Sequence, residues 1–277
     1  MEAASVPERV AGGRVALPPP PPRVRRPGPF LYLIVAGVAA FVIHAYMSGV
    51  AIAPSTLIEG VGPLAQFAAD AFPPDLDRLG PIGAALLETF EIALVGTLFG
   101  TILAVPLAVM AARNTSPHPL AYAASRGLIA LMRTIPDIVW GLIFVVTVGL
   151  GAPAGVLAIT VDVAGFSGRF FADSIEDVDQ GLIDGLAATG ASDTGIVAGA
   201  VVPSVTPAWT ATTMFSLEQA TRSSVVLGIV GAGGIGVELT TSMSLLRYDE
   251  AATIILAIFV VVLGVERLSS AVRSRIR

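Results

Sequence analysis

Apolar stretches long enough to cross a lipid bilayer recur along this chain. The first is FLYLIVAGVAAFVIHAYMSGV at residues 30–50, and another is GAALLETFEIALVGTLFGTILAVPLAVMAA at residues 83–112. A helix needs about 20 predominantly apolar residues to cross a hydrocarbon layer about 30 Å thick. Hydrophobic residues make up 54% of the chain and charged residues 13%, whereas roughly a quarter of an ordinary soluble domain is charged. These features predict an all-α, polytopic membrane protein.

About six transmembrane helices account for the apolar stretches, and arginines cluster before the first and after the last. By the positive-inside rule, both termini are expected in the cytosol of a multi-pass cell-membrane protein. The segments that we expect, in order, are a disordered Pro/Arg-rich tail (1–29), a first transmembrane helix (30–52), an acid-biased external loop with an interfacial helix (53–82), a transmembrane core (83–270) that includes a cytosolic segment (176–203), and a cytosolic tail (271–277). Within the core, the spans are expected at 83–112, 120–151, 153–178, 195–230 and 250–270.

Composition also excludes several kinds of site. The chain has no cysteine, so a thiol nucleophile and Cys-based metal sites are impossible, and its two histidines, His44 and His118, are far apart. We therefore expect no metal site and no catalytic residue. The net charge of −5 argues against a nucleic-acid partner, because such a surface needs a basic excess.

The segment VVLGIVGAGGIGVEL, residues 225–239, has glycines at the G-x-G-x-x-G spacing of dinucleotide-binding folds. Such a fold needs further parallel strands around the motif, and the flanking sequence consists of expected membrane helices, so we reject that interpretation. Two others stay open: a tight packing corner with Arg222 paired to Glu218, or a surface that contacts an anionic solute. The residues that would form the solute surface are Arg222, Ser223, Ser224, Gly231, Gly233 and Gly234.

A second charged position lies inside the span at 120–151. Arg133 and Asp137 are one helical turn apart and could face each other, and Pro136 is expected to kink the helix between them. Ionisable groups at membrane depth usually face the interior of a helix bundle. We expect a structural ion pair or, alternatively, a contribution to the solute pathway.

The most specific motif is DGLAATGASDTGIVAGAVVP, residues 184–203. It resembles the "EAA" motif of permease subunits in binding-protein-dependent ABC importers, which forms short coupling helices seated in a cleft of the ATPase. Here Asp184 replaces the usual glutamate, while the glycine and the final proline are kept. A glycine permits a sharp turn between two short helices, and a proline suits the first turn of the next one. By this resemblance, the ATPase-coupling residues are Asp184, Gly185, Leu186, Gly190, Val202 and Pro203.

The resemblance extends over about residues 84–270. The segments ETFEIALVGTLFGTILAVPLAVMAARN, RTIPDIVWGLIFVVTVGLG and RSSVVLGIVGAGGIGVEL are similar to the phosphonate-transport permease branch of that family. This implies a type I ABC importer permease fold like that of methionine importers. It also implies a phosphorus oxyanion as the solute: phosphonate, phosphite or phosphate.

The resemblance further implies a set of partners in the membrane. Two permease subunits, expected to be two copies of this chain, would form the pathway; two ATPase subunits would bind ATP and Mg; and an extracytoplasmic phosphonate- or phosphate-binding protein would deliver the solute. The chain itself has no G-x-x-x-x-G-K-[ST] loop and no lysine, so we expect no ATPase site in it. The alternative function is an ion-coupled secondary transporter that uses membrane acids such as Asp137 and Asp162.

Overall fold

The computed structural model describes residues 28–49 and 54–275. Only residues 28 and 29 of the predicted Pro/Arg-rich tail are among the described residues. Residues 50–52, the end of the predicted first span, lie outside them. The chain divides into two compact units, residues 1–63 and 64–277.

The first unit contains helix α1 (Pro29–Met47) and the start of helix α2 (Pro54–Asp70). None of the α1 residues is buried, and its apolar side chains are exposed along the whole helix, as expected for a helix that contacts lipid. α2 forms where the sequence predicts an interfacial helix. Its location at the membrane interface stays a prediction.

The second unit is built from helices, and the residues that the structure describes contain no strand. The all-α prediction is therefore confirmed, and the rejected dinucleotide-binding sheet has no counterpart there. The helices are α3 (Leu79–Ala111), α4 (Pro119–Thr134), α5 (Asp137–Val148), α6 (Ala152–Glu176), α7 (Gln180–Ala188), α8 (Asp193–Ile196), the π-helix η1 (Val197–Val201), α9 (Val202–Ile229), α10 (Ile235–Ser244) and α11 (Tyr248–Arg275).

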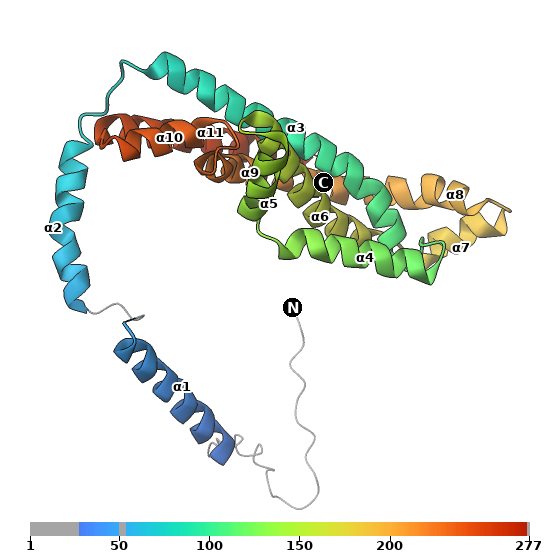
Figure 1. Cartoon of the computed structure of the whole chain (residues 1–277). Coiled ribbons are helices and arrows are strands. Elements are labelled where there is room, and N and C mark those ends of the chain that lie inside the picture. Colours follow the sequence, from blue (N-terminus) through green and yellow to red (C-terminus); the bar gives the residue numbers. More distant parts are fainter. Residues whose placement is uncertain (1–27, 50–53, 276–277) are drawn as a thin grey trace, which may run out of the picture. The chain divides into compact units, whose positions relative to one another are not determined.

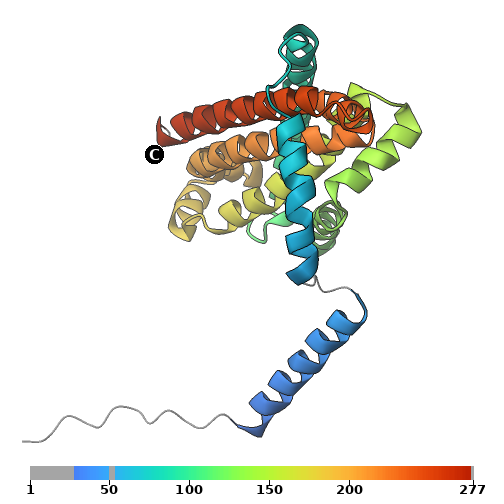
Figure 2. The same ribbon diagram turned by 90° about the vertical axis from the view of Figure 1, so that its left-hand side faces the viewer.

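The core of this unit lies where α3, α6 and α9 pack together (Figure 1). Glycines on α3 allow the close approach that the sequence predicts for small residues four apart. A Cβ on Gly96 would lie 2.6 Å from Ile159 Cγ2, and one on Gly100 would lie 2.6 Å from Val163 Cβ. α11 also packs on α9 (Figure 2), where Ser269 Oγ donates a 2.7 Å hydrogen bond to the Met214 carbonyl.

The predicted kink at Pro136 is confirmed, and it is a complete break. α4 and α5 meet at an angle of 92°. Ile135, the residue before the proline, adopts an extended conformation with ψ of 122°, because the proline ring disfavours the helical region for its predecessor.

Four described helices are long and apolar enough to cross a membrane, namely α1, α3, α6 and α11, and the bent pair α4 and α5 makes a fifth. The sequence predicts a further span that corresponds to α9. This helix has 28 residues, but it lacks a stretch as apolar as those of the other spanning helices. α11 extends to Arg275 and so includes most of the predicted cytosolic tail. The cytosolic location of that tail stays a prediction.

Candidate functional site

The predicted coupling segment lies at one end of the second unit, and α10 lies at the other (Figure 1). The first helix of the coupling segment, α7, is capped by Asp179, whose carboxylate accepts a 2.9 Å hydrogen bond from the Gly181 N–H. Gly190 follows with φ of +81°, which L-residues adopt only under strain. The predicted sharp glycine turn between two short helices is therefore present.

The two predicted coupling helices fold back against each other. A Cβ on Gly199 would lie 3.2 Å from Leu186 Cδ2, so Leu186 packs on η1. Asp184 accepts a hydrogen bond from the Gln180 side chain at 3.0 Å and stays exposed, as does Gly185. The segment thus presents an exposed acidic residue on a packed helical hairpin.

Val202 and Pro203 begin α9, with the proline in the first turn as predicted. They do not begin a separate helix, because α8, η1 and α9 follow one another without a break. Proline lacks an N–H and its ring clashes with a carbonyl one turn earlier. A local π-helical turn, such as η1 just before Pro203, is one of the adjustments by which membrane helices tolerate proline.

Charged residues tie the helix ends together near the coupling segment. Arg126 donates to the Ala111 carbonyl at 2.7 Å and pairs with Asp173 at 3.1 Å and Glu176 at 3.0 Å. Arg113 donates to the Tyr122 hydroxyl at 3.2 Å, and this hydrogen bond raises the pKa of the Arg113 guanidinium above its ordinary value. α3, α4 and α6 are thereby joined at this end of the unit.

The glycine-rich segment forms the connection between α9 and α10 at the opposite end. Gly231, Gly233 and Gly234 have φ of +86°, +86° and +75°. The loop is packed between α3 and the start of α6: Gly151 N–H donates to the Gly231 carbonyl at 2.9 Å, and Ile235 N–H donates to Thr89 Oγ1 at 2.7 Å. This geometry is that of a tight packing corner.

The polar residues before this loop have partners within the protein. Arg222 pairs with Glu218 at 3.0 Å, as the packing interpretation predicts, and Glu218 also pairs with Arg273 at 3.6 Å. Ser224 is buried and donates to the Thr89 carbonyl at 3.1 Å, and Ser223 is buried as well. Contact of these residues with a solute stays a prediction.

The predicted pairing of Arg133 with Asp137 is wrong. No ion pair joins them in the described part of the chain, where α4 ends at Thr134 and α5 begins at Asp137. The break at Pro136 removes the helical spacing on which the prediction depended. The stem of Arg133 packs instead toward α6, where a Cβ on Gly165 would lie 3.2 Å from its Cγ, and Asp137 accepts from the Ile138 N–H at 2.8 Å.

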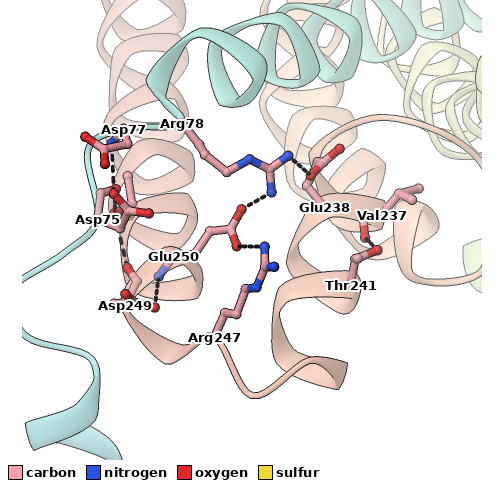
Figure 3. Close-up of polar contacts among 10 residues, drawn as sticks. Asp75, Asp77, Arg78, Val237, Glu238, Thr241, Arg247, Asp249 and Glu250 are labelled. Atoms are coloured by element: carbon pink, nitrogen blue, oxygen red, sulfur yellow. Dashed lines mark hydrogen bonds and ion pairs between the residues drawn. The ribbon is translucent and has the colours of Figure 1, made fainter.

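A cluster of charges at the α10 end was not among the residues predicted from the sequence (Figure 3). We call it the Glu250 cluster; it consists of Arg78, Glu238, Arg247 and Glu250. The Glu250 side chain is only 3% exposed and pairs with Arg78 and with Arg247, the latter at 3.4 Å, while Arg78 also reaches Glu238 at 3.5 Å. The cluster joins the starts of α3 and α11 to α10.

Sequence separation explains why this cluster was missed. Arg78 and Glu250 are 172 positions apart, and no local pattern links residues at such a distance. Correlated changes at the two positions among related sequences would be the signal that could find the pair.

Comparison with known proteins identifies the family. Residues 104–277 match the family described as the binding-protein-dependent transport system inner membrane component. The chain belongs to this family. It is a permease of binding-protein-dependent ABC importers, embedded in a membrane, and importers of this type work with an ATPase and a solute-binding protein.

Related proteins agree with this assignment. The permease is 37% identical over 80% of its length to the phosphite transport system permease protein of Stutzerimonas stutzeri, covering 81% of that protein. It is 42% identical over 77% of its length to a putative phosphite transport system permease of the same organism, covering 76% of it. It is also 39% identical over 79% of its length to the phosphate-import permease of Mycolicibacterium smegmatis (strain ATCC 700084 / mc(2)155), covering 41% of that protein.

A solved structure supports the predicted fold. The inward-facing methionine ABC transporter MetNI matches with a TM-score of 0.64 at 22% identity, covering 73% of the permease and 99% of that chain. The methionine-importer-like fold is therefore confirmed.

Proposed function

We propose that this permease imports a phosphorus oxyanion, namely phosphonate, phosphite or phosphate, driven by a separate ATPase. The observation that supports the solute class is identity of 37% to 42% with permeases named for phosphite and phosphate. The exposed α7–α8 hairpin, with its glycine turn at Gly190, is suited to docking in the ATPase.

In this proposal the permease has no ATPase site, and ATP and Mg bind to two partner ATPase subunits. Two copies of the permease form the pathway, and an extracytoplasmic binding protein for phosphonate or phosphate delivers the solute. The coupling residues are Asp184, Gly185, Leu186, Gly190, Val202 and Pro203. Both termini face the cytosol.

The test is solute uptake by proteoliposomes that contain the permease, its ATPase and the binding protein. We expect uptake of labelled phosphite, phosphonate or phosphate that needs ATP on the ATPase side, with sulfate as the control anion. Uptake of sulfate alone would refute the solute class.

The same vesicles separate ATP-driven import from ion-coupled transport. We expect uptake to stop when the ATPase is omitted and to continue when an ionophore collapses the proton gradient. Uptake that persists without the ATPase and is lost with the ionophore would establish the secondary-transporter alternative instead.

A further inference from the structure

The α7–α8 hairpin projects from the end of the bundle (Figure 1), and an irregular stretch of helix joins it to the rest of α9. This stretch begins with the π-helix η1, which lies directly between α8 and α9. Pro203 and Pro207 follow in the first turns of α9. Sharp bends in helices occur almost always at prolines or at π-turns, and here the two features are adjacent.

The backbone of this stretch also lacks part of its hydrogen bonding. A proline has no N–H, so neither Pro203 nor Pro207 can donate to a carbonyl in the preceding turn. The hydroxyls of Ser204 and Thr206 donate to the carbonyls four residues earlier at 2.8 Å and 2.7 Å. Hydroxyls that bond back in this way slightly destabilise a helix and often bend it. The start of α9 is therefore easier to bend than a helix with all of its backbone hydrogen bonds.

The two sides of this stretch have different surroundings. Val201 and Val205 are buried in the cluster that contains Phe171 of α6. Pro203 and Pro207 lie on the opposite side of the helix and are exposed. Bending on the proline side therefore needs no rearrangement of the buried valines, which can serve as a pivot.

A pocket beside this stretch gives the hairpin room to move. It has a volume of about 330 Å³ and lies between the end of α6, the start of α7 and the start of α9. Its lining includes Ser174 of α6, Leu182 of α7 and Ala208 of α9. Protein interiors are close-packed, so a helix shifts most easily where such space exists. Here α7 can approach α9 without displacing core side chains.

We propose that η1 and the first turns of α9 form a hinge, on which the α7–α8 hairpin pivots relative to the bundle and narrows the pocket when the ATPase binds ATP. The hairpin then moves separately from α9 and is not a rigid extension of that helix. This inference rests on the proposed function only in assuming that the hairpin docks in the ATPase.

Pairs of cysteines test the pivot, because the chain has no cysteine of its own. Leu182→Cys with Ala208→Cys places one thiol on each side of the hinge. Ser174→Cys with Ala208→Cys is the matched control, since it spans the same pocket without crossing the hinge. Each pair, in the full complex in membranes, is treated with a short bifunctional thiol reagent, with or without a non-hydrolysable ATP analogue, and cross-linked peptides are quantified by mass spectrometry.

We expect the ATP analogue to raise the cross-linking yield of the hinge pair about threefold, by shifting the population towards the closed pocket, and to leave the control pair unchanged. An unchanged or lower yield for the hinge pair, or an equal change in both pairs, would overturn the inference. Uptake is measured in the same preparation. A yield that responds to the analogue without uptake of any phosphorus oxyanion contradicts only the proposed solute, and such uptake without a response contradicts only the hinge.

Pro207→Ala tests whether this stretch has to bend. Alanine supplies the missing N–H, so we expect a higher unfolding temperature together with a severalfold loss of ATP-driven uptake. A merely structural proline would not combine these two effects. Pro106→Ala is the control, because Pro106 is also an exposed proline inside a long helix, α3; it should raise the unfolding temperature and keep wild-type uptake. Wild-type uptake by Pro207→Ala would show that no hinge is needed there.

Discussion

At the scale of single residues, Gly228 and Gly236 bring the end of α9 and the start of α10 into backbone contact. A Cβ on Gly228 would lie 2.7 Å from Gly236 Cα, and one on Gly236 would lie 2.8 Å from Gly228 Cα and would overlap the Val225 carbonyl oxygen. Backbone atoms cannot move aside as a flexible side chain can. The glycine cluster is therefore required by packing, whether or not it also contacts solute.

Gly236→Ala tests this packing. We expect a loss of about 3 kcal/mol in the free energy of unfolding, because inserting a methyl group into a filled site strains the backbone. Gly264→Ala is the matched control: nothing lies within 4 Å of its Cβ position, and alanine favours a helix over glycine by about 1 kcal/mol. Unfolding in mixed detergent micelles measures both, and equal stabilities would contradict the packing role.

The Glu250 cluster gives a second prediction at this scale. Arg78→Met leaves the buried Glu250 carboxylate with Arg247 as its remaining partner, and we expect a loss of about 2 kcal/mol in unfolding free energy. The double change Arg78→Met with Glu250→Met is expected to lose less, because it removes the buried charge as well. The same unfolding measurement applies. A double variant that is less stable than the single one would show that the cluster does not act as a charge pair.

At the scale of elements, the α7–α8 hairpin depends on one backbone conformation. Gly190 has nothing within 4 Å of its Cβ position but has φ of +81°, so substitutions there act through backbone strain and not through a clash. This makes it possible to change the turn while leaving the rest of the hairpin in place.

Gly190→Val and Gly190→Asn separate the turn from the side chain. Valine disfavours positive φ and asparagine tolerates it, so we expect Gly190→Val to lower ATP-driven uptake about tenfold if roughly 1.4 kcal/mol of strain opposes docking. Gly190→Asn should keep most of the uptake. The measurement is ATPase stimulation and uptake in proteoliposomes at equal permease content, and equal activity of the two variants would refute the proposed role of the turn.

At the scale of the whole molecule, the location of the two termini depends on whether α9 crosses the membrane in spite of its polarity. If α1, α3, the α4–α5 pair, α6, α9 and α11 each cross once, the number of crossings is even and both termini lie on the same side. If α9 does not cross, the termini lie on opposite sides.

Cysteine labelling in intact cells distinguishes these cases. We expect cysteines added at the two termini to react with a membrane-impermeant maleimide only after permeabilisation. Leu245→Cys, in the connection between α10 and α11 and 58% exposed, should react in intact cells. Labelling of one terminus in intact cells would contradict the six-span topology.

The sequence by itself determined the features that depend on local interactions. The apolar stretches specify a helical membrane protein, Pro136 specifies the break between α4 and α5, and Gly190 specifies the turn of the hairpin, because each acts within a few residues. The packing interpretation predicts the pairing of Arg222 with Glu218 for the same reason, since the two residues are one helical turn apart.

Only the tertiary structure decided which distant residues meet. It placed Arg78 beside Glu250 and packed the glycine loop against Thr89 and Gly151. Long-range pairing depends on how whole helices pack, and a helix can place the same side chain against many possible neighbours, so local patterns do not specify which one is chosen.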